Sequence, residues 1–272
     1  MLGGYWESVL IFMGINCLMG ISLYIPMTAG LISLGQGGFM AIGAYLSAVL
    51  TKADVPFALA LCAGGGAAAV AGLIVGAPAL RIRGIYVMIL TLGFGEIVRV
   101  FFGNFEPTGG ASGMGGIRPL TELWQVLAVT AVTLLVVWRI RHLRFGRAMV
   151  AIHEDDGAAE AMGINLTRTK LLSFTLGALI AGVAGGLYAH QALFIDAQQF
   201  DFMRSATAFL YVILGGMANP FGPVVGAAIV TLLPELLRVV QDWRMTVFGT
   251  LLVVMAIWRP DGLLPSLRSR AK

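Results

Sequence analysis

The sequence contains few charged residues and few cysteines. Charged residues make up 12% of its 272 residues, whereas soluble domains have about 25%. This composition excludes an ordinary soluble globular domain. Cys17 and Cys62 both lie inside apolar runs, so we expect two packed thiols and no disulfide or metal pair.

Motifs for catalysis and for nucleotide binding are also missing from the sequence. The pattern Gly-x4-Gly-Lys-Ser/Thr, whose backbone amides hold nucleotide phosphates, occurs nowhere. The histidines are not spaced as metal ligands, and no serine lies in a nucleophile elbow. Basic residues flank apolar runs and form no continuous basic face. We therefore expect no enzyme, no cofactor or metal bound by this chain, and no nucleic-acid partner.

Apolar residues, in contrast, are abundant at 58%. A helix needs about 20 of them to cross about 30 Å of hydrocarbon. The sequence therefore predicts an all-α membrane protein, a polytopic helical bundle of about nine transmembrane segments. Charges and turn residues bound the expected segments at Val9–Ile25, Gly30–Leu50, Pro56–Leu80, Gly84–Phe105, Glu122–Trp138, Leu171–Ala189, Met203–Met217, Phe221–Leu237 and Met245–Trp258.

One long polar segment, at about residues 139–170, interrupts these apolar runs. Short loops rich in Lys and Arg stay in the cytoplasm, so we expect this basic segment and the carboxyl end inside. The external cations are then Lys52, Arg118, Arg204, Arg238 and Arg244. Asp155 and Asp156 are expected to cap a short helix from Ala158 to Met162. Gly163 is expected to end that helix in the left-handed conformation.

Two glycine-rich segments predict broken or re-entrant helices. Ser33–Gly43 contains four glycines, each lowering helix propensity by about 1 kcal/mol. Leu214–Pro223 contains Asn219-Pro220, which interrupts a helix. Unwound backbone at membrane depth occurs only where protein or a watery cavity satisfies it, so paired breaks indicate a transport path. Close helix packing through small residues is the alternative.

Glu96 and Arg99 are charges inside an apolar run. They lie three residues apart, hence on one helical face, and each costs about 2.5–3.5 kcal/mol at mid-membrane if unpaired. We expect them to pair or to face an aqueous path, and a structural ion pair near the outer end is the alternative to substrate contact. The candidate path residues are Ser33, Gln36, Gly37, Gly38, Glu96, Gly215 and Gly216.

The polar segment contains a motif that resembles a known family. Gly157-Ala158-Ala159, followed by three residues and Gly163, is similar to the EAA-type coupling loop of ABC importer permeases, with Gly157 in place of the usual glutamate. Further stretches resemble, in order and over nearly the whole chain, the branched-chain amino acid permease family of the LivM type. These stretches are residues 33–39, 81–86, 91–96, 159–165, 214–216 and 259–263.

The resemblance implies a single transmembrane permease domain over residues 1–272, with the ABC importer permease fold, in the bacterial inner membrane. It implies a sister LivH-like permease, two ABC ATPase subunits that use the ATP, and an external solute-binding protein that delivers the substrate. The ATPases would push on the coupling residues Gly157, Ala158, Ala159, Glu160, Ala161, Met162 and Gly163.

The substrates implied are leucine, isoleucine and valine. Permeases of the same family for urea, short amides or other amino acids are the alternative. A self-sufficient ion-coupled carrier or channel is the alternative of a different class.

Overall fold

The computed structural model describes residues 2–80, 82, 84–236, 249–250 and 262–263. Helices dominate this part of the chain, and its only extended pairing is an isolated antiparallel bridge between Met114 and Ile195. The helices are α1 (Leu2–Thr28), α2 (Gln36–Lys52), α3 (Phe57–Ala79), α4 (Ile85–Asn104), α5 (Leu123–His142), α6 (Arg144–Glu154), α7 (Asp156–Ala161), α8 (Leu166–Ala192), α9 (Phe202–Gly215) and α10 (Gly222–Leu236), with short 3-10 turns η1 (Glu106–Thr108), η2 (Gly110–Ser112) and η3 (Ala197–Phe200).

Five of the described helices are long and apolar enough to cross a membrane, namely α1, α3, α4, α5 and α8. This confirms the predicted polytopic helical membrane protein. The helices α2 and α9 have 17 and 14 residues, fewer than the about 20 that a full crossing needs. The helix α10 is described over 15 residues, up to Leu236. The ninth expected segment, Met245–Trp258, lies almost wholly outside the described residues.

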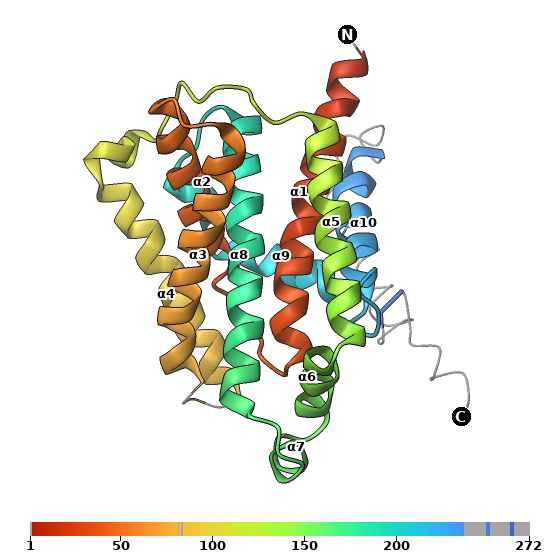
Figure 1. Cartoon of the computed structure of the whole chain (residues 1–272). Coiled ribbons are helices and arrows are strands. Elements are labelled where there is room, and N and C mark those ends of the chain that lie inside the picture. Colours follow the sequence, from red (N-terminus) through yellow and green to blue (C-terminus); the bar gives the residue numbers. More distant parts are fainter. Residues whose placement is uncertain (1, 81, 83, 237–248, 251–261, 264–272) are drawn as a thin grey trace.

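The helices α1, α2 and α3 pack around α8, while α5 packs against α1 and α4 packs against α2 (Figure 1). Small residues allow this close approach. A Cβ atom added at Gly64 of α3 would lie 2.8 Å from the carbonyl oxygen of Gly43 in α2. One added at Gly43 would overlap the backbone of Gly182 in α8. The glycines therefore set the spacing of these three helices.

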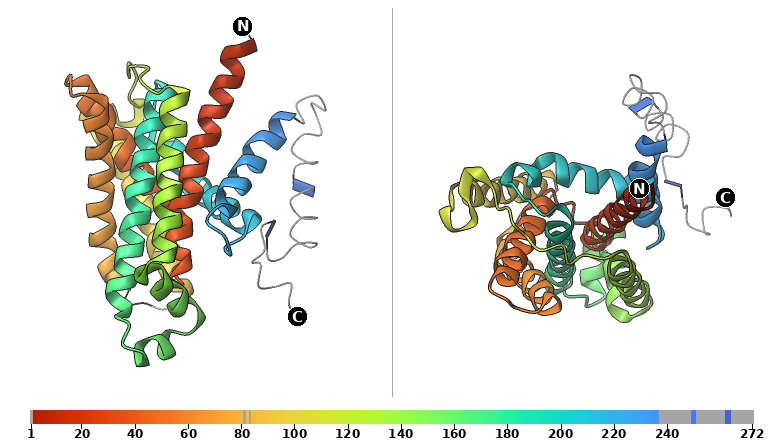
Figure 2. Two further views of the ribbon diagram at one scale, coloured as in Figure 1. Left: turned by 45° about the vertical axis from the view of Figure 1, so that its right-hand side comes forward. Right: turned by 90° about the horizontal axis from the view of Figure 1, so that it is seen from above.

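The helix α9 does not stand upright in the bundle. It crosses behind α8 and α1 at mid-height in Figure 1, and the view from above in Figure 2 shows it lying lengthwise across the molecule. At 1.5 Å per residue its 14 residues extend about 21 Å. The upright span expected at Met203–Met217 is therefore wrong. After α9 the chain reverses into α10, which packs beside α1 at the edge of the bundle (Figure 2).

Among the described residues, the loops that the charge distribution predicted on opposite sides of the membrane lie at opposite ends of the bundle. The α1–α2 and α3–α4 connections meet the start of α8 at the end where α7 protrudes. At the opposite end, Lys52 Nζ donates to the Gly115 carbonyl oxygen at 2.6 Å, and Arg118 pairs with Asp54 at 2.7 Å. The side predicted to be cytoplasmic and the side predicted to be external are thus opposite ends of the helical bundle.

Candidate functional site

The short helix α7 forms as the sequence predicted, starting slightly earlier. Asp155 is its N-cap, and its Oδ1 accepts hydrogen bonds from the backbone N–H groups of Gly157 at 2.8 Å and Ala158 at 3.0 Å. Such a cap satisfies amides that have no partner in the first helical turn. Gly163 follows the helix with φ of +81°, which glycine adopts without the steric cost of a side chain.

The helix α7 protrudes from the end of the bundle (Figure 1). Of the predicted coupling residues Gly157 to Gly163, only Ala159 is buried, while Met162 is 84% exposed. Asp156 pairs with Lys170 of α8 at 2.8 Å. α7 is therefore an exposed element tied to a long helix that packs against three others.

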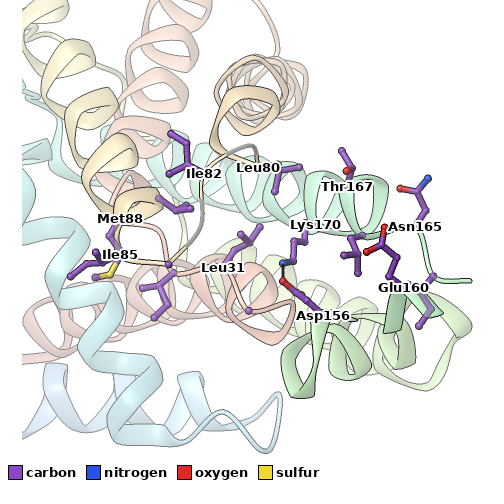
Figure 3. Close-up of a pocket in the computed structure, with 16 residues that line it drawn as sticks. Leu31, Leu80, Ile82, Ile85, Met88, Asp156, Glu160, Asn165, Thr167 and Lys170 are labelled. Carbon is purple, nitrogen blue, oxygen red and sulfur yellow. Dashed lines mark hydrogen bonds and ion pairs between the residues drawn. The ribbon is translucent and has the colours of Figure 1, made fainter. Parts of the chain in front are cut away.

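A pocket of about 790 Å³ lies behind α7. Figure 3 shows polar side chains from α7 and the start of α8 on one side of it and apolar side chains on the other. The polar groups include Asp156, Glu160 and Lys170, and the apolar groups include Leu31, Ile85 and Met88.

The first predicted break lies between α1 and α2. The chain is not helical from Leu31 to Gly35, so the expected segment Gly30–Leu50 becomes a connection followed by α2. Ser33 and Gln36 are buried, and Gln36 Oε1 accepts from Ser22 Oγ at 3.4 Å.

Other helices supply partners for the backbone of this break. The N–H of Leu34 donates to Thr91 Oγ1 of α4 at 3.0 Å, and the N–H of Gly37 donates to Ser205 Oγ of α9 at 2.8 Å. A Cβ atom added at Gly38 would lie 3.0 Å from Gly95 Cα. The structure thus brings Ser33, Gln36, Gly37 and Gly38 together where α1, α2, α4 and α9 meet.

The second predicted break lies between α9 and α10. Gly216 has φ of +94°, and Gly215 approaches the backbone of Gly222 so closely that an added Cβ would overlap its carbonyl oxygen. The predicted interruption at Asn219-Pro220 is confirmed, since helix resumes at Gly222. This break is a tight local reversal, so Gly215 and Gly216 act there through packing and backbone conformation.

Glu96 and Arg99 form the expected ion pair. Arg99 Nη2 lies 2.7 Å from Glu96 Oε2, and Arg99 Nη1 donates to Gln198 Oε1 of η3 at 2.9 Å. Their side chains are 36% and 27% exposed. Glu96 is therefore paired within α4, and Arg99 connects the pair to η3. Among the described residues, Glu96 forms no hydrogen bond with either break.

Arg204 is a residue that the sequence analysis placed wrongly. The charge distribution places it on the external side. It lies instead in the first turn of α9, with its guanidinium carbon 4.7 Å from the Tyr188 ring centroid and Nε 3.5 Å from Met40 Sδ. Its Nη2 is buried and has no hydrogen-bond partner in the part of the chain that the structure describes. Among the described residues no carboxylate forms an ion pair with it. The only indication of this burial in the sequence is the position of Arg204 directly before an apolar run.

The described residues contain no group of three or more His, Cys, Asp or Glu side chains that could hold a metal ion.

Comparisons with known proteins agree with this architecture. A family model described as "Branched-chain amino acid transport system / permease component" matches residues 5–256. The high-affinity branched-chain amino acid transport system permease proteins LivM of Salmonella typhimurium and Escherichia coli are each 35% identical over 300 residues, covering 97% of this chain and 69% of each relative. The LivH permease protein of Escherichia coli is 32% identical over 146 residues, covering 52% of this chain and 46% of that protein. No solved structure matches.

The family match covers most of the chain, and the LivM similarity extends over nearly all of it. Together with five helices of membrane-crossing length and composition, these matches establish a multi-pass membrane transport permease. The chain belongs to the family of permease components of branched-chain amino acid transport systems.

Proposed function

We propose that this chain is one permease subunit of an ATP-driven importer of leucine, isoleucine and valine. The observation that carries the proposal is the geometry of α7, a capped helix that protrudes from the bundle with most of its surface exposed. The names of the LivM relatives support the substrate class. Urea, short amides and other amino acids are the alternative substrates within the same mechanism.

The partners follow from this role. Two separate ATPase subunits dock from the cytoplasm on the exposed surface of α7, and ATP is used by them. A sister permease completes the path, and the similarity to LivH, a permease of such a system, supports a pair of related permeases. An external binding protein delivers the substrate.

The ATPases exert their force on the permease at the coupling residues Gly157 to Gly163. The Asp155 cap keeps α7 helical, and the Asp156–Lys170 pair connects it to α8. α8 packs against α1, α2 and α3, so a displacement of α8 changes the break between α1 and α2. The candidate path residues Ser33, Gln36, Gly37 and Gly38 lie at that break.

Two glycines with similar positive φ angles allow a matched test of this coupling. Gly163 and Gly116 both have positive φ, of +81° and +69°, and a Cβ added at either meets nothing within 4 Å. Gly163→Val and Gly116→Val therefore carry similar local strain. We expect Gly163→Val to abolish most ATP-dependent uptake in proteoliposomes while membrane insertion is unchanged, and Gly116→Val to retain uptake.

Equal uptake by the two variants would overturn the coupling role of α7. Uptake by the chain alone in liposomes, independent of ATP and abolished by collapsing an ion gradient, would replace the importer by a self-sufficient carrier.

A further inference from the structure

The pocket behind α7 has the size and the chemistry of a small-molecule site. Its volume of about 790 Å³ falls within the about 300–1,000 Å³ of typical ligand pockets. The carboxylates of Asp156 and Glu160 and the ammonium of Lys170 line one side, and Leu31 and Met88 contribute to an apolar wall (Figure 3). Both signs of charge beside an apolar wall match a zwitterion with an aliphatic side chain.

The pocket and the exposed surface of α7 share Asp156 and Glu160 and otherwise use different residues of the same helix. Asp156 and Glu160 are four residues apart, so they lie on one helical face, and both line the pocket. Ala158 and Met162 are exposed and do not line it. A ligand in the pocket therefore leaves Ala158 and Met162 accessible to the ATPases.

We propose that this pocket binds a free aliphatic L-amino acid from the cytoplasm, the product of import, and that its occupancy slows the transport cycle. The inference rests on the proposed function. The amino group of the ligand donates to Glu160, its carboxylate accepts from Lys170, and its side chain packs against Ile85 and Met88. An ammonium has three donors, so Lys170 keeps its bond to Asp156 while it binds the ligand.

Inhibition follows from the position of the ligand between α7 and the bundle. A ligand shifts a conformational equilibrium only by binding one state more tightly than another. The pocket is assembled while Asp156 is paired with Lys170, and a bound amino acid adds a second bridge between α7 and α8. It thereby stabilises this arrangement against displacement by the ATPases.

The test uses the complete transporter in proteoliposomes, with ATP inside, binding protein and labelled leucine outside, and increasing unlabelled leucine inside. The variants are Ile85→Trp, which fills the pocket, and Ile89→Trp, one turn further along α4. Ile85 and Ile89 are 65% and 60% exposed, and only Ile85 lines the pocket. The readout is the initial rate of uptake and of ATP hydrolysis.

We expect internal leucine to slow the wild type and Ile89→Trp, and Ile85→Trp to need about tenfold more leucine for the same inhibition. Without internal leucine the three proteins should transport at similar rates. Internal 4-methylpentanoate, which lacks the amino group, and leucinol, which lacks the carboxylate, should not inhibit.

Three results would overturn the proposal while leaving the importer intact: rates independent of internal leucine, equal inhibition of both variants, or equal inhibition by the two analogues. Failure of the wild type to take up leucine at all would instead overturn the proposed function.

Discussion

The glycine that follows α7 and the glycines at the break between α9 and α10 are needed for different physical reasons. Gly163 has open space around it and is needed for its positive φ. Gly215 faces the backbone of Gly222, which leaves no room for a side chain. The first region is shaped by local conformation and polar contacts, and the second by contact between backbones. Substitutions in α7 should therefore change coupling, whereas substitutions at the breaks should change the fold.

The largest effect is expected from Gly215→Val, because its side chain would overlap the Gly222 carbonyl oxygen. We expect a loss of stability at or above the about 3 kcal/mol at the upper end for overpacking, seen as loss of monodisperse protein in size-exclusion chromatography. The control is Gly66→Val, since a Cβ at Gly66 meets nothing within 4 Å. Normal behaviour of Gly215→Val would show that the reversal between α9 and α10 is loosely packed.

A smaller loss is expected from Ser205→Ala. The hydroxyl of Ser205 accepts from the buried N–H of Gly37, and leaving that donor unpaired costs about 1–3 kcal/mol. Thr207→Ala is the control, because the Thr207 hydroxyl bonds only within its own helix, to Met203. Thermal unfolding in detergent measures both variants, and equal melting temperatures would argue against the contact between α2 and α9.

Asp155→Ala should separate coupling from stability. Loss of an N-cap costs about 1 kcal/mol, and here the cost falls on a six-residue helix outside the bundle. We expect uptake to fall strongly while the melting temperature changes little. Asp155→Asn keeps a capping side chain and should retain most uptake, so equal defects in the two variants would contradict the role of the cap.

The smallest effect is expected from Asp156→Asn. The Asp156 side chain is 50% exposed and that of its partner Lys170 is 16% exposed. Ion pairs with an exposed member contribute about 0–1 kcal/mol, and Asp156→Asn keeps an oxygen that can accept from Lys170. Any difference in melting temperature from the wild type should shrink in high salt, because salt screens exposed charges. Asp54→Asn removes the exposed ion pair with Arg118 at the other end of the bundle. Its change in melting temperature is the reference for an exposed ion pair.

Features encoded by a few neighbouring residues could be predicted from the sequence. The Asp155 cap, the left-handed Gly163, the interruption at Asn219-Pro220 and the Glu96–Arg99 pair all depend on local spacing. The membrane class followed from the apolar runs, and the family resemblance was confirmed by the comparisons.

Features that depend on contacts between distant residues could not be predicted. The run containing α9 is largely apolar, and its crosswise path depends on packing against α1, α2 and α10. The burial of Arg204 follows from that path, because Tyr188 and Met40 come from other helices. The pocket combines three segments that are far apart in the chain.

Arg204 places a fixed positive charge in the first turn of a helix that crosses the bundle at mid-height (Figure 1). Moving one elementary charge through the full transmembrane potential changes its energy by about 2.3 kcal/mol per 100 mV. A tilt of α9 that carries the guanidinium along the membrane normal therefore performs electrical work.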